Sequence, residues 1–226
     1  MQRIELTLDQ LIDRAAELTT SGRKLLGITG APGAGKSTIA REIISKLGKD
    51  RAALAPMDGF HLSNATLIAE GKRDRKGAID TFDAEGYLNL LERLKRADED
   101  VVHAPDYYRT FEESIGSAIP IKRAIPLVIT EGNYLLSSQG AWVKVRDLLD
   151  QCWFIDLAED IRIDRLIKRH IEVGKSPAEA EVWSRGSDQK NAEQILALRA
   201  AADFVITVRS EEHTSELQSQ STISYA

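Results

Sequence analysis

Eight residues near the start of the chain limit its fold more than any other feature. Positions 30–37 read Gly-Ala-Pro-Gly-Ala-Gly-Lys-Ser, the Walker A pattern, between an apolar run at 25–29 and a helical pattern at 36–47. In that context a glycine-rich turn directs successive backbone N–H groups at phosphate oxygens, and the helix behind it adds the positive end of its dipole. The pattern therefore predicts a strand, a phosphate-binding loop and a helix, rather than a glycine-rich turn that binds nothing.

Each position of this loop has an expected role. Lys36 should reach the β- and γ-phosphates of a nucleotide, and the hydroxyl of Ser37 should bind Mg²⁺. The other positions would surround the phosphate oxygens, mainly with backbone groups: Gly30, Ala31, Pro32, Gly33, Ala34, Gly35 and Thr38. The loop alone does not separate a kinase from a nucleotide switch or a motor.

Composition narrows the class of protein. The 226 residues, 42% hydrophobic and 29% charged, suit one compact domain, which we assign to residues 1–208. The net charge of −5 argues against nucleic acid or an anionic membrane as the main partner. The single cysteine, Cys152, can form no internal disulfide, and residues 1–18 contain no unbroken apolar stretch. We therefore expect a cytoplasmic protein, a monomer or a homodimer.

The last residues differ from the rest of the chain. From Arg209 onward the sequence is polar and without periodicity, and it resembles the translation of a sequencing-library adapter. We expect residues 209–226 to be a non-native tail, the alternative being an ordinary disordered terminus.

Apolar runs of strand length alternate with helical patterns along the chain, which predicts an α/β fold with a largely parallel sheet. The expected strands are 25–29, 52–57, 101–104, 127–130, 153–157 and 204–208. The expected helices are 8–20, 36–47, 84–97, 141–149, 159–172 and 178–200, the last with a break near Gly186. Residues 111–125 read as a short hairpin or an irregular excursion.

Polar side chains follow several of these strands. Ligands of open parallel sheets bind at the carboxyl ends of the strands, so these side chains are candidates for the site. Asp58 could accept a proton from an acceptor hydroxyl, and Glu131 could hold Mg²⁺; alternatively each caps a turn. The other candidates for acceptor binding are His61, Asn64, Tyr107, Arg109 and Asn133.

Two groups of basic residues stand out. Arg162, Arg165 and Arg169 are spaced to share one face of the helix 159–172, where they would close over a triphosphate or form a solvated surface. His170, beside them, suits packing better than catalysis. The basic cluster between Lys72 and Lys76 is either a solvated loop or a funnel for anions.

Together these residues amount to a family resemblance. The chain resembles the uridine kinase and bacterial pantothenate kinase group through its loop, Met57–Leu62, Arg75–Asp83 and Glu131–Leu136. It looks still more like the nucleoside/nucleotide kinase-like proteins labelled "putative fructose transport system kinases". The likeness covers most of residues 20–208.

The resemblance implies a P-loop NTPase three-layer sandwich with strand order 2-3-1-4-5, a helical lid over about 159–190, and ATP with Mg²⁺. In that group the acidic residue after the second strand contacts the acceptor hydroxyl, which corresponds to Asp58. Arg165 and Arg169 correspond to the lid arginines that bind phosphate, and Arg109 to an arginine that binds acceptor or phosphate. The Gly-Phe-His continuation after Asp58 departs from uridine kinases, so the identity of the acceptor stays open.

From these observations we expect an ATP-dependent kinase that phosphorylates a hydroxyl of a small metabolite: a sugar, a nucleoside or a pantothenate-like alcohol. Asp58, Lys36 and Arg165 would carry the chemistry. The alternative is a P-loop ATPase or regulatory nucleotide-binding protein without a small-molecule acceptor.

Overall fold

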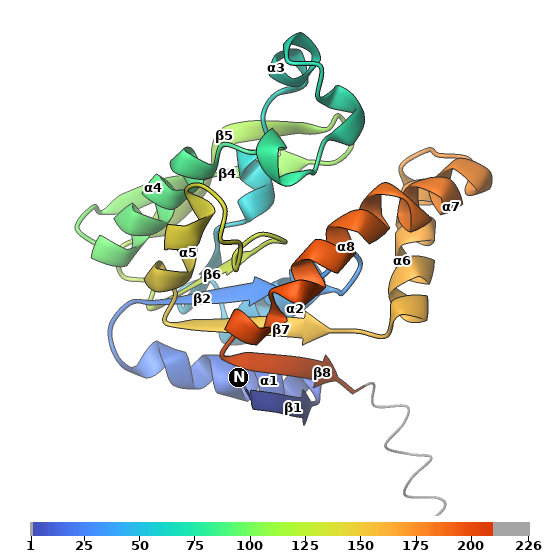
Figure 1. The fold of residues 1–226 in the computed structure, drawn as a ribbon. Coiled ribbons are helices and arrows are strands. Elements are labelled where there is room, and N and C mark those ends of the chain that lie inside the picture. The colour runs from blue at the N-terminus through green and yellow to red at the C-terminus, as the bar shows by residue number, and fades with distance from the viewer. Residues whose placement is uncertain (1, 210–226) are drawn as a thin grey trace, which may run out of the picture.

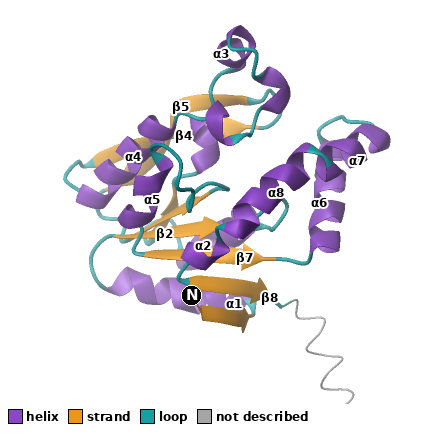
Figure 2. Ribbon diagram, in the orientation of Figure 1, coloured by secondary structure: helices purple, strands orange, loops and turns teal. Residues whose placement is uncertain are grey.

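A parallel β-sheet with helices on both faces forms the centre of the structure, a computed structural model that describes residues 2–209 (Figures 1 and 2). The strands of this sheet are β1 (Gln2–Leu6), β2 (Lys24–Thr29), β3 (Ala52–Leu54), β6 (Leu127–Glu131), β7 (Gln151–Asp156) and β8 (Phe204–Val208). They lie in the order β1-β8-β7-β2-β6-β3, and every neighbouring pair is parallel.

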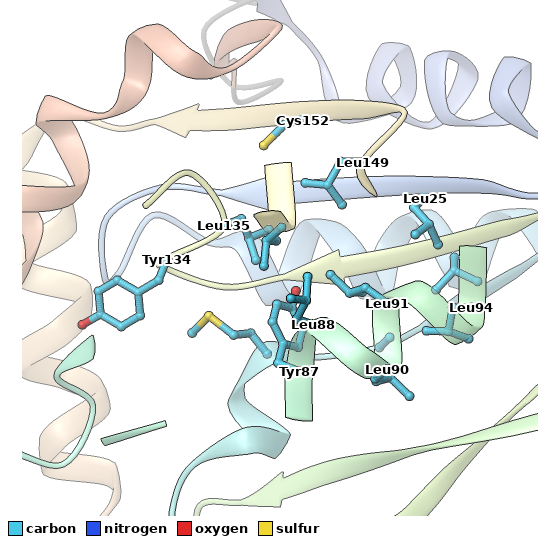
Figure 3. Packing of buried hydrophobic residues seen from close by; sticks show 14 of the residues in the cluster. Leu25, Tyr87, Leu88, Leu90, Leu91, Leu94, Tyr134, Leu135, Leu149 and Cys152 are labelled. Carbon is cyan, nitrogen blue, oxygen red and sulfur yellow. The ribbon is translucent and has the colours of Figure 1, made fainter. Parts of the chain in front are cut away.

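Alternate residues of the strands build two separate cores. In β2, Leu25 faces a cluster formed with α4 (Ala84–Arg96), α5 (Trp142–Leu148) and α8 (Ser187–Ala197), part of which is shown in Figure 3. Leu26 faces the opposite cluster, formed with α1 (Leu8–Glu17) and α2 (Lys36–Leu47). Because both faces are covered, a strand such as β6 is buried along its whole length. The three-layer α/β fold expected from the sequence is confirmed.

The strand order extends the expected one. Counted from β2, and without the hairpin described below, the strands β3-β6-β2-β7-β8 follow the expected order 2-3-1-4-5. A sixth strand within residues 2–209, β1, adds to the edge beside β8, from Gln2 paired with Phe204 to Leu6 paired with Val208. The sequence analysis missed β1, which is short, polar at alternate positions and largely exposed.

The expectation that 101–104 belongs to the central sheet is wrong. These residues begin β4 (Val101–Tyr108), which pairs with β5 (Glu113–Lys122) as a separate antiparallel hairpin. Val102 and Ala104 are buried while Val101 and His103 are exposed, the alternation of a strand with one covered face. Residues 111–125, expected to be a short hairpin or an irregular excursion, supply only the second strand of this hairpin, whose first strand is β4. The strand expected at 52–57 is also shorter, ending at Leu54 before a 3₁₀ turn at Met57–Phe60.

Local sequence signals fix the ends of the helices. Thr7 and Gln10 form a capping box at α1, and Ser176 and Glu179 form another at α7 (Pro177–Arg185). The helix α6 (Glu159–Glu172) has the expected bounds, and Gly186 separates α7 from α8 as expected. The remaining helical segments are α3 (Asn64–Ala69) and 3₁₀ turns at Leu18–Thr20, Arg73–Arg75, Ile79–Thr81 and Arg199–Ala201.

Two groups of elements rise from the carboxyl edge of the sheet (Figure 1). The β4–β5 hairpin and α3 lie on one side and α6 and α7 on the other, while α8 runs back from α7 toward the start of β8. We call α6, α7 and α8 the lid helices. None of the helices described in residues 2–209 is long and apolar enough to cross a membrane. Apart from Arg209, the tail lies outside the described residues, so its assignment stays a prediction.

Candidate active site

The phosphate loop is held tightly between β7 and α6. Gly30, Gly33 and Gly35 have φ angles of 146°, 84° and 91°, which side chains rarely adopt. A Cβ at Gly30 would lie 2.5 Å from the carbonyl oxygen of Ile155, and one at Gly33 would lie 2.7 Å from that of Arg162. Glycine is therefore needed at Gly30 and Gly33 for both backbone shape and space, and at Gly35 for backbone shape.

Lys36 lies buried behind the loop. Its Nζ donates to the carbonyl oxygens of Gly30 and Ala31 at 2.9 and 3.1 Å. Burial lowers the pKa of Lys36 to about 8, although the nearby charges of Glu131 and Asp58 act to raise it. The ammonium group is thus poorly solvated, and a triphosphate entering the loop would compensate its charge.

Ser37 and Glu131 meet across the sheet edge, 94 positions apart in the chain, and the Ser37 hydroxyl donates to Glu131 Oε1 at 3.0 Å. The Glu131 side chain is buried, and its pKa is raised by burial and then by the charge of Asp58. A hydroxyl and a carboxylate oxygen are ligands that Mg²⁺ prefers, so the pair fits such an ion. Among the described residues no cluster of His, Cys, Asp and Glu could hold a metal by itself. Phosphate oxygens and water would therefore complete the coordination.

Asp58 lies in the 3₁₀ turn after β3, facing the hairpin. Its Oδ2 accepts a hydrogen bond from Arg109 Nη2 at 3.3 Å, and the two groups form an ion pair. The glycine that follows explains how the turn and the hairpin fit, because a Cβ at Gly59 would lie 2.4 Å from the carbonyl oxygen of Pro105. Close backbone packing thus fixes Asp58 relative to Arg109.

His61 is held in place by a backbone contact and by two aromatic side chains. Its Nδ1 lies 2.7 Å from the carbonyl oxygen of Asp58, and because a carbonyl only accepts, Nδ1 carries the hydrogen. Burial lowers the pKa of His61, which favours the neutral ring and leaves Nε2 as an acceptor. The ring is held between Phe82 and Tyr107, with centroids 4.0 and 4.5 Å away.

Two cavities meet at this point. The loop cavity, about 670 Å³, is lined by the phosphate loop, α6 and the ends of β7 and β8. The hairpin cavity, about 330 Å³, is lined by the hairpin, the lid helices and the turn that contains Asp58. Lys36, Ser37, Arg109 and Arg169 line both cavities. A group bound in the loop could therefore be transferred to a molecule in the hairpin cavity.

The structure separates the three arginines that were expected to share a cationic face. Arg165 and Arg169 line the loop cavity, and the pKa of Arg169 is lowered by burial and by the charge of Arg109. Arg162 is instead buried and donates to the carbonyl oxygen of Pro32 at 3.3 Å and to Gln189. Arg162 thus connects α6 and α8 to the phosphate loop, because packing against the loop takes up its side of the helix.

Most of the other expected acceptor-site residues lie in the hairpin cavity, namely Asp58, His61, Tyr107, Arg109 and Asn133. Asn64 is the exception, because at the start of α3 its Oδ1 accepts from Lys76 at 2.8 Å and its N–H donates to Glu113. It supports Lys76, which lines the cavity in its place.

Several residues of the hairpin cavity were missed as site residues. The cluster between Lys72 and Lys76 proved to be neither a solvated loop nor a funnel as a whole: Arg75 pairs with Asp80, while Arg73 and Lys76 line the cavity. His170 packs near Trp183, as expected of a packing residue, but it also bonds Asp188 at 2.7 Å, and all three line the cavity. No spacing rule identifies these residues, because the lid helices and the segment after α3 bring them together from distant parts of the chain.

Comparison with known proteins decides the family. A sequence model of the Phosphoribulokinase / Uridine kinase family matches residues 25–213. The chain belongs to this family. It is therefore a P-loop kinase that uses ATP, and its family implies a small-molecule acceptor.

Individual members of the family align over most of the chain. YggC of Escherichia coli K12, an uncharacterized protein, is 32% identical over 193 residues, which cover 84% of this chain and 79% of YggC. A Schizosaccharomyces pombe protein named "Putative uridine kinase C227.14" is 30% identical over 186 residues, covering 78% of this kinase and 79% of that protein. The crystal structure of a "putative fructose transport system kinase" from Silicibacter sp. TM1040 superposes with a TM-score of 0.79 at 33% identity, covering 88% of this kinase and 98% of that chain.

Proposed function

We propose that this kinase transfers the γ-phosphoryl group of ATP to a hydroxyl of a small polyhydroxy metabolite held in the hairpin cavity. The observation that carries the proposal is that Asp58, Lys36, Ser37 and Glu131 line one cavity that adjoins the phosphate loop. The candidate acceptors are sugars, nucleosides and pantothenate-like alcohols.

In this proposal the acceptor hydroxyl gives its proton to the Asp58 carboxylate. Its oxygen attacks the γ-phosphorus, and the bond from that phosphorus to the β–γ bridging oxygen breaks, which leaves ADP. Lys36, Arg165 and Arg169 would neutralise charge on the transferring group, and the lid helices would limit the access of water. Mg²⁺, held by Ser37 and Glu131 together with phosphate oxygens, would add a further positive charge.

Two neighbouring hydrogen-bond acceptors support the choice of a polyhydroxy compound. Asp58 and His61 both line the hairpin cavity, and a carboxylate and an imidazole Nε2 without a hydrogen both accept hydrogen bonds. A metabolite with one hydroxyl at Asp58 and a second donor at His61 would satisfy both. Arg109 pairs with Asp58 here, so a bound acceptor would have to share that carboxylate with it.

Incubation of the protein with ATP, Mg²⁺ and a pool of sugars, nucleosides and vitamin precursors tests the proposal. Mass spectrometry should show one class of compound gaining a phosphoryl group, and the Lys36→Ala protein, as control, should give none. Release of free phosphate with no labelled acceptor would contradict the proposal and favour an ATPase.

A further inference from the structure

The loop cavity has an apolar part that neither the phosphate loop nor the lid arginines provide. Its cationic part contains the loop residues Gly33–Thr38 together with Arg165 and Arg169, and suits a triphosphate. Leu157, Val208 and Leu8 also line the cavity. Asp156 pairs with Thr207, and Leu6 pairs with Val208, so these side chains follow the edge formed by β7, β8 and β1.

Leu8 is held firmly at this edge. The strand before it pairs with β8, and the backbone N–H of Arg209 donates to the carbonyl oxygen of Leu6 at 3.0 Å. The Thr7–Gln10 capping box then fixes Leu8 as the first residue of α1. Leu11 and Ile12 of the same helix are buried in the core shared with α2. Leu8 is only half-buried, so part of its side chain is free to contact a ligand.

We infer that the N-terminal unit of β1 and α1 forms one wall of the site for the nucleobase of ATP, with Leu8 packing against the ring. When the triphosphate occupies the cationic part, Leu8, Leu157 and Val208 offer apolar surface to the base, beside the charged Asp156 and Arg209. The family match starts at residue 25, so this unit precedes the segment that the family defines. The inference rests on the proposed binding of ATP at the loop.

A comparison of ATP with inorganic tripolyphosphate separates the base from the phosphates. Leu8→Asn should weaken ATP binding about tenfold, the effect of losing roughly 50 Å² of apolar contact, and leave tripolyphosphate binding unchanged. The milder Leu8→Ala should show the same selectivity with a smaller loss. Leu18→Asn is the matched control, since Leu18 also packs half-buried against the α1–α2 core but does not line the cavity. It should leave both affinities unchanged.

Isothermal titration calorimetry with each ligand, on variants whose melting temperatures show that they are folded, gives these affinities. Unchanged ATP binding by both folded Leu8 variants would overturn the inference, as would an equal loss for both ligands. If the wild-type protein binds neither ligand, the phosphate site of the proposed function fails as well.

Discussion

Replacing Glu131 by glutamine should stabilise the free protein and weaken its complex with ATP and Mg²⁺. The side chain is 5% exposed, and burial raises the pKa of its carboxyl more than Lys36 and Ser37 lower it. A raised pKa in the folded state means that ionisation opposes folding. Stability therefore falls as the pH rises from the ordinary value of 4.5 toward the raised value, and glutamine avoids that loss.

The structure also sets the size of the effect. Glutamine Oε1 can still accept from Ser37, which donates to Glu131 Oε1 at 3.0 Å, so no hydrogen bond is lost. Replacing a buried ion pair by neutral groups of similar volume is neutral or stabilising by about 1–4 kcal/mol, whereas removing one partner alone leaves the other charge less compensated. Lys36 loses the compensating charge of Glu131 in this variant but keeps that of Asp58, so we expect a gain at the lower end of that range, about 1–2 kcal/mol. In a chain of this length that raises the melting temperature by about 2–8 °C.

Thermal melts at neutral pH measure both halves of this prediction. In EDTA without nucleotide, the Glu131→Gln protein should melt above wild type. With ATP and Mg²⁺ the order should reverse or the gap should close, because a tenfold loss of affinity removes about 1.4 kcal/mol of ligand stabilisation. Ser37→Ala, the control, should also lose ligand stabilisation but without the gain in EDTA. A Glu131→Gln protein that melts below wild type in EDTA would refute the reasoning.

Three further substitutions test the other parts of the site. Asp58→Asn should lower turnover by about 10²–10⁴-fold while a fluorescent ATP analogue still binds, and loss of nucleotide binding would contradict its role as the base. The kcat/KM for ATP should fall as the pH rises through about 8, because Lys36 then loses its proton. Nucleotide affinity should fall over the same pH range in wild type, and the residual affinity of Lys36→Ala should not. Gly59→Ala should cost about 1–3 kcal/mol in urea unfolding because its Cβ would lie 2.4 Å from the Pro105 carbonyl oxygen. Gly116→Ala, which meets nothing within 4 Å, should stay near wild type, and equal costs would contradict this account.

The centre of the fold could be predicted from the sequence because its signals are local. The phosphate loop combines a strand, a turn and a helix within one short segment, and β6 begins with the apolar run Leu127–Ile129 and ends in Glu131. Parallel strands bring their carboxyl ends to one edge, so Ser37 and Glu131 could be expected to meet although 94 positions separate them.

The hairpin and β1 could not be placed in the same way. Val101–Ala104 has the length and composition of a sheet strand, and only its alternation of buried and exposed side chains reveals one covered face. The segment Gln2–Leu6 has few apolar residues and is a strand because β8 offers it a pairing edge. The placement of both segments depends on contacts with residues distant in sequence, which intrinsic secondary-structure propensity does not predict.

The arginines of α6 also show that a sequence pattern does not predict tertiary packing. Spacing placed Arg162, Arg165 and Arg169 on one helix face, but only Arg165 and Arg169 line the loop cavity. In the structure Arg162 is covered by the loop and by Gln189 of α8. Helical periodicity predicts on which face of the helix a side chain lies, but the elements packed against the helix decide whether that face is buried or exposed.

The residues predicted from the sequence are mainly those proposed for the chemistry, and the residues that were missed line the acceptor cavity. The groups proposed for the chemistry, Lys36, Ser37, Asp58 and Glu131, lie in the loop and at or just after strand ends, where the sheet fixes them. The walls that would select the acceptor belong to the hairpin, the lid helices and the segment after α3, including Tyr107, Trp183 and Lys76. Substitutions in these walls should therefore change which hydroxyl compound is phosphorylated while leaving ATP binding intact. Because the phosphate-binding residues and the acceptor-binding residues lie on different elements, the acceptor specificity of this fold can change while the phosphate site stays the same.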